Sequence, residues 1–574
     1  MAWLNKLNIG DHKKKFFIYI ILVLVTLAVY WQVHGFDFIN FDDQVYLINN
    51  INFQSDVTPD VLRWAFTTNH ADLWNPFLWL SFILDYQFYG LNPGGYHITN
   101  LILHILSALL LFLLINRTTQ TVWPSAFVAA IFALHPLHVE SVAWATERKD
   151  VLSAFFWMLT LCLYAWYTEK PSVRKYLLVF FSFFCALMSK SMVVTLPAIM
   201  ILLDYWPLNR FETQKNKINL ILWQLKEKTP FFILSAVFSI ITFYVQYYIP
   251  SLRHFPVLKP SPLDSRLANA AVSFVTYLEK TFWPHDMAVF YPYPSHIPTW
   301  QVIAASMLII VISALVIFMI KRLPYLFVGW LWYVITILPV IKIVQIGSDA
   351  MADRYHYLPS IGISIMVVWG FLSLIRNESV RKYILFPSAV AIVALLAVLT
   401  WQQCGYWKNS IELWGHALKV TRDNALAHGN YASALYEEGN IEEALSHYNK
   451  AILLKPDKED GSFYNSRGAI FHLKNQFQLA LNDYSKAINI NAANYRAYNN
   501  RGITYATIGR IDLALEDFNK AAFYKPDFAD AYDNRTFIYY KQGNKASCCY
   551  NAKKACELGK CENWEALVNE GFCR

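Results

Sequence analysis

The sequence predicts an all-α protein in two parts, a polytopic membrane unit followed by a water-soluble solenoid of helix pairs. Of its 574 residues, 56% are hydrophobic and only 16% are charged, whereas soluble domains carry about 25% charged residues. The apolar residues form continuous blocks of the length that crosses ~30 Å of hydrocarbon as a helix. The composition changes sharply near Gln402, after which no such block occurs. The continuous blocks exclude a soluble enzyme, and also a transmembrane barrel, whose strands would alternate.

About eleven blocks qualify as membrane spans, and they define a membrane domain over residues 1–401. Blocks 176–190 and 191–207 are also compatible with one broken helix. Segment 268–284 is apolar enough to span, but counting it would place Lys321 and Arg322 outside, so we predict an interfacial or re-entrant helix there. The predicted spans are 16–35, 97–116, 122–139, 151–168, 176–190, 191–207, 231–249, 301–320, 324–341, 357–375 and 383–401.

Basic residues in the short loops predict the orientation, because Lys and Arg accumulate on the cytoplasmic side. The N-terminus carries Lys6 and Lys13–Lys15, and the apolar run after it lacks a small-residue cleavage site, which favours an uncleaved first span. With eleven spans the soluble tail is expected outside, in the periplasm of a bacterial inner-membrane protein. The net charge of +8 comes from residues that flank apolar blocks, so it predicts contact with membrane lipids and no nucleic-acid partner.

The tail contains an internal repeat, with three copies over residues 425–458, 461–494 and 495–528. Small residues at fixed offsets let two antiparallel helices touch closely while aromatic residues fill the groove, and this pattern resembles the tetratricopeptide repeat (TPR). Residues 402–424 are expected to form a linker, and 529–574 a degenerate repeat with a cysteine-rich cap. The recurring positions are Ala444, Ala480 and Ala514; Tyr448, Tyr484 and Phe518; Ala451, Ala487 and Ala521; and the turn residues Gly439, Asn475 and Gly509.

Five of the eight cysteines lie in that cap. Disulfide bonds are the main prediction, because an outward-facing tail lies in an oxidising compartment. A metal site is the alternative, although the spacing fits no standard zinc pattern. Since five is an odd number, at least one thiol should stay free or pair elsewhere. The cysteines are Cys548, Cys549, Cys556, Cys561 and Cys573.

The first outer loop, residues 36–96, is long for a connection between two spans. Thr58-Pro59-Asp60 predicts the start of a helix, and the apolar stretches that follow are typical of amphipathic helices along the membrane surface. Asp42 and Asp43 come soon after the first span ends, near the depth of the headgroups. These two carboxylates have two interpretations, as turn residues or as catalytic groups.

The second outer loop, residues 135–150, concentrates ionisable groups between two apolar helices. Such groups are costly at membrane level, which favours a functional role. Its two histidines are more often structural than metal-bound, since zinc requires three or more ligands. Its acidic residues either hold a divalent ion or pair with the neighbouring cations. The ionisable residues are His135, His138, Glu140, Glu147, Arg148, Lys149 and Asp150.

Further charged residues are expected at the same depth. Lys190 interrupts an apolar stretch, and the last inter-span loop contains Asp353, Arg354 and His356. Carboxylates and cations therefore gather in one layer at the outer membrane surface. A lipid-linked phosphate would lie at this depth, where cations can bind it and a carboxylate can act as a base.

Several long motifs resemble the membrane half of the TMTC family, the transmembrane-and-tetratricopeptide O-mannosyltransferases, as found in its prokaryotic relatives. The motifs are FDD in the first outer loop, WNPFLWLSFILDYQFYGLNPGGYHITNLILH, HPLHVESVAWATERKD, SKSMVVTLP with LLDYWPL, and DRYHYLPS. The resemblance covers essentially the whole chain. Two features depart from the family. Ser191 stands where relatives often have proline, and the tail is shorter than in eukaryotic members. The shorter tail affects the prediction of the acceptor more than the prediction of the reaction.

The resemblance implies a GT-C fold over residues 1–401 and an inverting glycosyltransferase. Such an enzyme would move a sugar, by resemblance mannose, from a polyprenyl-phosphate carrier to an acceptor hydroxyl, by resemblance on protein Ser or Thr. An acidic residue in the first outer loop is then the expected base, so the resemblance favours the catalytic interpretation of Asp42 or Asp43. Lys190, Arg354 and Arg148 are expected to bind the donor phosphate.

The remaining candidate residues have supporting roles in this interpretation. Glu140, Glu147, Asp150, His135 and His138 would hold a divalent metal ion or orient the cations, and no other cofactor is predicted. The TPR groove would recruit the acceptor protein or a partner. The alternative function is a non-catalytic, membrane-anchored TPR scaffold, although an anchor needs only one span.

Overall fold

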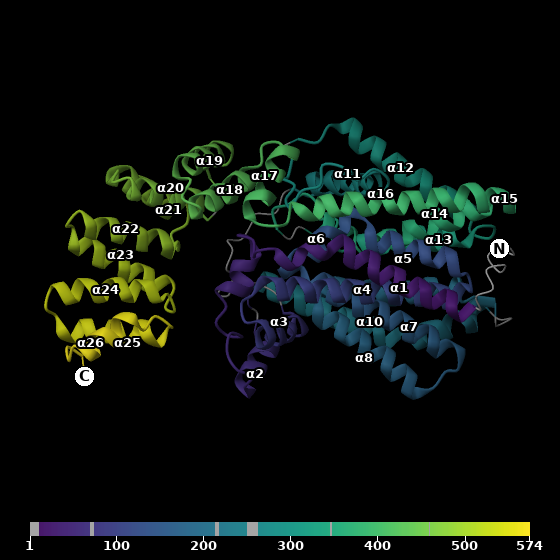
Figure 1. The fold of residues 1–574 in the computed structure, drawn as a ribbon, viewed down its shortest axis with the longest axis horizontal. Helices are drawn as coiled ribbons and strands as arrows, with labels where there is room; N and C mark the ends of the chain where they lie inside the picture. Colours follow the sequence, from purple (N-terminus) through teal and green to yellow (C-terminus); the bar gives the residue numbers. More distant parts are fainter. Residues whose placement is uncertain are drawn as a thin grey trace. The chain divides into compact units, whose positions relative to one another are not determined.

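The computed structural model describes residues 11–573 except 69, 71–73, 213–216, 249–261, 295, 345–346 and 458–459. In these residues the chain is helical and contains no strand, only an isolated β-bridge between Pro292 and Asp349. The chain divides into two compact units, one that ends at Thr421 and one that begins at Arg422 (Figure 1). The predicted all-α fold is confirmed. Lys6 of the predicted cytoplasmic N-terminus lies outside the described residues.

The first unit is a bundle whose long helices run alongside one another (Figure 1). Helix α4 packs against α5 and α7, and α13 pairs with α14. The helices are α1 (Asp11–Tyr30), α2 (Pro59–Thr67), α3 (Pro76–Tyr89), α4 (Pro93–Thr119), α5 (Val122–Leu134), α6 (Val139–Ala143), α7 (Arg148–Glu169), α8 (Val173–Ser189), α9 (Leu196–Tyr205), α10 (Lys217–Tyr248), α11 (Leu263–Phe282), α12 (Thr299–Phe318), α13 (Pro324–Ile337), α14 (Ser360–Leu374), α15 (Glu378–Val380), α16 (Phe386–Gly405) and α17 (Ser410–Val420). Short helical turns used below are η3 (Gln44–Ile48), η7 (Ser191–Thr195) and η10 (Asp353–His356).

Each predicted span overlaps a helix of this unit, but the span predicted over 122–139 covers α5 and the start of α6, with a break at His135 between them. Residue 249 lies outside the described residues. Six described helices are long and apolar enough to cross a membrane, and the bent pair Val122–Leu134 and Pro136–Ala143 is a seventh if it counts as one span. Three shorter apolar helices are Ser191–Tyr205, Pro324–Ile337 and Ser360–Leu374. The chain is therefore a multi-pass membrane protein, while the count of eleven and the orientation stay predictions.

The segment predicted as an interfacial or re-entrant helix forms α11, which holds a loop in place. Asn269 Nδ2 donates to Ala350 O at 2.9 Å, and Tyr277 Oη donates to Ala352 O at 2.9 Å. Residues 269 and 277 lie on one face of the helix because they are eight positions apart. The loop that they hold leads directly into η10, so α11 supports the segment that carries Asp353 and Arg354. The position of α11 relative to the membrane stays a prediction.

The second unit consists of antiparallel helix pairs (Figure 1). Its helices are α18 (Ala425–Glu437), α19 (Ile441–Leu454), α20 (Ser462–Leu473), α21 (Phe477–Ile490), α22 (Tyr495–Thr507), α23 (Ile511–Tyr524), α24 (Ala529–Lys541), α25 (Lys545–Glu557) and α26 (Glu562–Asn569). The first three pairs correspond to the three predicted repeats. The pair α24–α25 with α26 occupies the region predicted as a degenerate repeat and cap.

The recurring small residues let the two helices of each pair approach closely. Ala480 and Ala514 have no exposed surface. A Cβ atom added at Gly468 or Gly502 would lie 2.8 Å from the ring of Tyr484 or Phe518, respectively, which is too close for a side chain. The turn residues Gly439, Asn475 and Gly509 adopt positive φ angles of 83°, 58° and 81°, which glycine and asparagine tolerate best.

Residues 402–424 differ from the predicted linker. Helix α16 continues to Gly405, and α17 follows from Ser410 to Val420 within the first unit. Trp414 of α17 is fully buried, because this helix is amphipathic and has a surface to pack against. The chain therefore leaves the first unit only after Thr421.

The expected disulfide bonds are present in the cap. They join Cys549 to Cys573 and Cys556 to Cys561, and Cys548 remains a buried thiol. One of the five cysteines of the cap thus stays unpaired, as we expected from their odd number.

We expect the double substitution Cys549→Ser and Cys573→Ser to lower the free energy of unfolding of the second unit. The bond closes a loop of 24 residues, and constraining a loop of that length in the unfolded chain is worth about 3 kcal/mol. The measurement is denaturant unfolding of the full chain. Cys548→Ala is the control, because it removes a buried thiol without removing a disulfide, and an equal loss in the two variants would contradict the expectation.

Candidate active site

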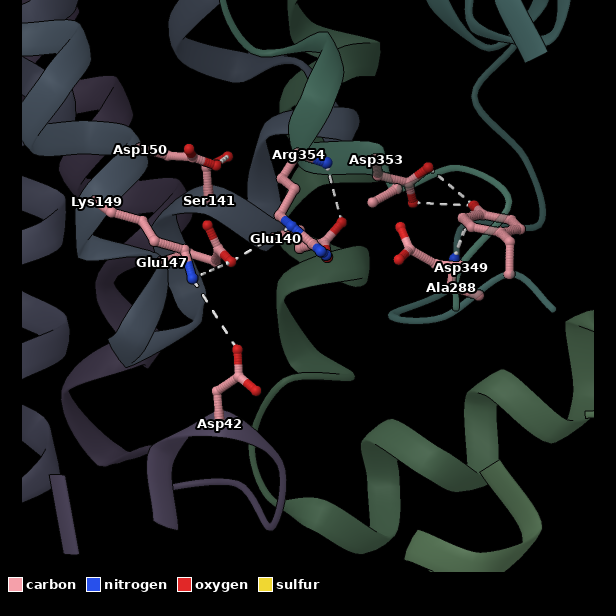
Figure 2. Close-up of polar contacts among 12 residues, drawn as sticks. Asp42, Glu140, Ser141, Glu147, Lys149, Asp150, Ala288, Asp349, Asp353 and Arg354 are labelled. Atoms are coloured by element: carbon pink, nitrogen blue, oxygen red, sulfur yellow. Dashed lines mark hydrogen bonds and ion pairs between the residues drawn. The ribbon is translucent and has the colours of Figure 1, made fainter. Parts of the chain in front are cut away.

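Four segments that are distant in sequence meet at one end of the first unit. They are the loop after α1, the turns between α5 and α7, the break between α8 and η7, and η10 before α14. Each provides charged side chains, and these contact one another across segments (Figure 2). These segments lie at the ends of apolar helices. Charged side chains can therefore gather there without being placed in the middle of an apolar helix.

The two adjacent carboxylates of the first loop have different environments. Asp43 is fully buried. Its Oδ1 accepts hydrogen bonds from Trp144 Nε1 at 3.0 Å and from the N–H of Thr146 at 3.2 Å, and its Oδ2 accepts from the N–H of Ile39 at 3.0 Å. Burial raises the pKa of Asp43 to about 7, although these donors oppose the shift. Asp43 therefore ties the first loop to the turns before α7.

Asp42 is the more open carboxylate. Its side chain keeps 27% of its surface exposed, and Oδ2 lies 4.0 Å from Lys149 Nζ (Figure 2). Burial of the surrounding loop raises the pKa of Asp42 above its usual value, while the charge of Lys149 lowers it. Asp42 is thus the carboxylate of the pair that combines access with a neighbouring cation.

Glu147 lies at the centre of the charged cluster. Its Oε1 is 3.1 Å from Lys149 Nζ and 3.3 Å from Arg354 Nε, and its Oε2 is 3.8 Å from Lys190 Nζ. Glu147 itself is 1% exposed, whereas the three cations keep 10%, 14% and 15% of their side chains exposed in the same order. The carboxylate therefore gathers three cations whose outer surfaces remain accessible.

Two more carboxylates fix the orientation of these cations. Glu140 pairs with the Arg354 guanidinium and also accepts the backbone N–H of Arg354 at 3.0 Å. Asp150 pairs with Lys190 and accepts a hydrogen bond from Ser141 Oγ at 3.1 Å (Figure 2). Glu147, Asp150 and Glu140 thus fix the positions of Lys149, Lys190 and Arg354, respectively. Cations fixed in this way are preorganised for binding an anion. We name the set Glu140, Glu147, Lys149, Asp150, Lys190 and Arg354 the charged cluster.

Arg148, expected as a ligand of the donor phosphate, does not join the charged cluster. It is fully buried, and its Nη2 lies 2.6 Å from Asp85 Oδ2 and donates to Tyr96 O at 2.8 Å. It also donates to the side chain of Asn100. Arg148 therefore fastens α7 to α3 and α4, and its surroundings leave no exposed surface for a substrate.

The two histidines of the second outer loop are also engaged within the fold. His135 donates through Nε2 to Thr281 O at 3.0 Å and accepts the N–H of Leu137 at Nδ1. His138 donates through Nδ1 to Phe132 O at 2.6 Å. In the described part of the chain, no group of three or more His, Cys, Asp or Glu residues is arranged to hold a metal ion. The charge of the acidic residues is instead balanced by lysine and arginine.

Beside the charged cluster, Asp353 is held by a tyrosine. Tyr291 Oη lies 2.8 and 3.0 Å from the two carboxylate oxygens of Asp353, and it accepts the N–H of Ala288 at 2.9 Å (Figure 2). Burial raises the pKa of Asp353 to about 6, while Lys280 lowers it. Asp353 thus connects η10 to the loop after α11.

Two contributors to the site, Trp144 and Asp85, were not assigned a role from sequence, and Lys149 was expected only as an ion-pair partner of the acidic residues. Lys149 is the cation nearest Asp42, Trp144 anchors Asp43, and Asp85 neutralises Arg148. Lys149 and Trp144 lie in the HPLHVESVAWATERKD motif, and Asp85 lies in the long motif of the first outer loop. An acidic residue within an otherwise apolar stretch, as at Asp85, is the signal that could have identified a buried partner.

The fold and the site define a class of protein, a multi-pass membrane protein with a charged cluster at one end of its helices and a TPR unit after them. Family models for the tetratricopeptide repeat match residues 425–458 and 495–528, and a TPR repeat model matches 468–509. Among solved structures, the crystal structure of MamA is 22% identical, with a TM-score of 0.24 over 28% of this chain and 90% of that chain.

Curated relatives are named protein O-mannosyl-transferases. Human TMTC1 is 27% identical over 72% of this chain and 52% of its own length, and Caenorhabditis elegans F38B6.6 is 26% identical over 76% and 63%. Mouse TMTC4 is 24% identical over 75% and 65%. The resemblance of this chain to the TMTC family, inferred from its motifs, is confirmed by these relatives. The chain spans about half to two thirds of the length of the relatives it matches.

Proposed function

We propose that this chain is an integral membrane glycosyltransferase, which moves a sugar from a polyprenyl-phosphate carrier to a hydroxyl of an acceptor protein. The observation that carries the proposal is the partly exposed carboxylate of Asp42, 4.0 Å from Lys149, which with Lys190 and Arg354 is one of three cations that Glu147 gathers. The names of the relatives favour mannose as the sugar and serine or threonine as the acceptor. The protein would lie in a bacterial inner membrane, with the charged cluster and the TPR unit on the outer side.

Asp42 is the catalytic base in this proposal, and Asp43 is its anchor. A general base must reach the proton that it removes, and Asp42 is the more exposed of the two. Asp43 uses both oxygens to hold the backbone and the Trp144 ring nitrogen. This assignment separates two roles that the sequence left open.

Lys149, Lys190 and Arg354 form the donor-phosphate site. Fixed cations stabilise the charge that grows on a leaving phosphate, and they do so more strongly where water is partly excluded. The partial exposure of these side chains suits them to this role, whereas the complete burial of Arg148 assigns it to structural support. Glu140, Glu147 and Asp150 orient the cations, and this role requires no metal ion.

The reaction is a single displacement. The carboxylate of Asp42 accepts the proton of the acceptor hydroxyl as the hydroxyl oxygen bonds to the anomeric carbon. The bond between that carbon and the phosphate oxygen breaks on the opposite face, and the polyprenyl phosphate leaves with the electron pair. The configuration at the anomeric carbon is inverted, because the hydroxyl attacks from the face opposite the leaving phosphate and no covalent sugar–enzyme intermediate forms.

The TPR unit recruits the acceptor protein or a partner. Stacked helix pairs provide an extended surface for peptides or partner proteins. A tethered acceptor has a raised effective concentration at the site. The competing function is a membrane-anchored scaffold without catalysis. The charged cluster favours the enzyme, because an anchor does not require buried ion pairs that are shared among three segments distant in sequence.

Transfer of radiolabelled mannose from polyprenyl-phosphate-mannose to total membrane protein distinguishes these functions. We expect label on protein with the intact chain reconstituted in vesicles, and we expect β-elimination to release it from serine or threonine. Vesicles without the chain are the control. Absence of label with mannose and with other common sugar donors would support the scaffold.

The pH dependence of transfer should report the ionisation of Asp42. The base must be ionised, so activity is lost as the pH falls through its pKa, which burial raises above the usual value. Lys149 lowers that pKa, and Lys149→Met should therefore move the acid limb of kcat/KM to higher pH. Lys170→Met, at an exposed position, is the control. An acid limb that stays in place or moves to lower pH would contradict the assignment.

A further inference from the structure

Helix α17 contacts the loop that carries Asp42. The N–H of Asn40 donates to Ser410 Oγ at 2.9 Å, and Trp414 Nε1 donates to the side-chain oxygen of Asn40 at 2.7 Å. Asn40 is therefore held by α17 through both its backbone and its side chain, two residues before Asp42.

Aromatic side chains add a second contact between α17 and the first loop, through Phe41 of the FDD motif. Phe41 lies between two indoles, stacked on Trp144 with a centroid distance of 5.4 Å and edge-on to Trp414 at 5.4 Å. Trp144 also contacts Trp407, in the turn before α17, at 5.7 Å. Trp144, Trp407 and Trp414 are all at most 2% exposed. The residue directly before Asp42 is thus packed between the turns of the second outer loop and α17.

Two hydrogen bonds to backbone carbonyl oxygens attach α17 and the turn before it to the same region. The N–H of Asp37 donates to Lys408 O at 3.0 Å. His416 donates through Nε2 to Met287 O at 3.0 Å. The helix is therefore attached both to the first loop and to the loop after α11, which approaches Asp353 through Tyr291.

We propose that α17 sets the position of the Asp42 carboxylate, and that Ser410 and Trp414 are positioning residues for transfer. The proposal rests on the function proposed above. Helix α17 ends at Val420, and α18 of the TPR unit begins at Ala425, so a short stretch of chain joins the repeats to the helix that holds the catalytic loop.

The physical reason is the sensitivity of proton transfer to distance. A displacement of about 1 Å in a reacting group can lower the rate about 100-fold. Asp42 lies on a loop, and its position depends on the residues that restrain the backbone before it. The cations of the donor site lie on α7, at Lys190 and in η10, and their ion pairs involve no residue of α17. Arg354 approaches α17 only indirectly, through the Trp144 ring at 5.5 Å, so a change at α17 should affect Asp42 more than the donor site.

Hydrogen exchange and kinetics of full-length variants test this role. Trp414→Phe keeps an aromatic ring in the stack and removes the Nε1–H donor, and Ser410→Ala removes the acceptor for the Asn40 N–H. Ser410→Ala also serves as the milder variant if Trp414→Phe lowers the folded yield. Trp401→Phe is the matched control, because Trp401 is 56% exposed on α16.

We expect amides of segment 37–41 to exchange about 10-fold faster in both variants, with kcat about 10-fold lower and the donor KM changed much less than kcat. Unchanged exchange would overturn the proposal, and so would faster exchange with a wild-type kcat. If the wild-type chain transfers no sugar, the proposed function fails together with the kinetic role. Exchange in segment 37–41 then decides separately whether α17 holds the loop.

Discussion

Asp42→Asn is expected to lower kcat for sugar transfer by about 10² to 10⁴, the contribution of a positioned general base. The amide keeps the size of the side chain but cannot accept a proton. Donor binding should stay close to wild type, because the phosphate contacts Lys149, Lys190 and Arg354 in the account above. The measurement is transfer under saturating donor and acceptor, with donor affinity measured separately on the same preparations.

Two further variants show whether this loss is specific. Asp56→Asn, at an exposed position in the same outer loop, should transfer at the wild-type rate. Asp43→Asn places an amide NH₂ beside the N–H of Ile39, so it should lower the folded yield and the stability of the loop. Transfer by Asp42→Asn at a normal rate would remove Asp42 from the mechanism.

Asp204→Ala is expected to give the largest loss of stability. Asp204 is fully buried at the end of α9, where Lys228 Nζ lies 2.6 Å and Arg210 Nη1 lies 3.0 Å from its oxygens. Tyr164 Oη donates to it at 2.7 Å. Glu227 pairs with the same two cations, so the four charges balance. Removing one acid leaves a buried positive charge without compensation, which costs about 3–5 kcal/mol.

The control for this prediction is an ion pair of similar geometry at the surface. Arg117 and Glu169 lie 2.7 Å apart with side chains 35% and 52% exposed. Because such exposed pairs contribute about 0–1 kcal/mol, Glu169→Ala should hardly change unfolding in detergent. Similar losses for Asp204→Ala and Glu169→Ala would show that the buried network does not stabilise the fold as described.

Local patterns allowed most of the fold to be predicted. Apolar blocks identify helices of the membrane unit, because a span needs about 20 apolar residues in a row. The TPR pairs were predicted with their turns, since Ala480, Tyr484 and Gly509 recur at fixed offsets. Helix α17 was missed because its role depends on contacts with residues 37–41, which lie some 370 positions earlier in the chain.

The site was predicted in composition but not in detail. Both Asp42 and Asp43 were candidates from sequence. The conformation of the folded loop buries Asp43 and leaves Asp42 partly exposed, and no local sequence pattern shows this difference. Arg148 and Lys149 are adjacent, and successive helix residues point about 100° apart, so one enters the bundle and the other faces Asp42. The pairing of Arg354 with Glu140 joins residues 214 positions apart, beyond any local pattern.

The most direct test of the central claim, that Asp42 acts as a base in a single displacement, is the configuration of the transferred sugar. Nuclear magnetic resonance of the glycosylated acceptor peptide, compared with the polyprenyl-phosphate donor, gives the anomeric configuration before and after transfer. We expect inversion, with product formed about 10² to 10⁴ times more slowly when Asp42 is replaced by Asn. Retention would require a double displacement or attack from the face of the leaving phosphate, and either would contradict this mechanism. Transfer at a normal rate by Asp42→Asn would also contradict it.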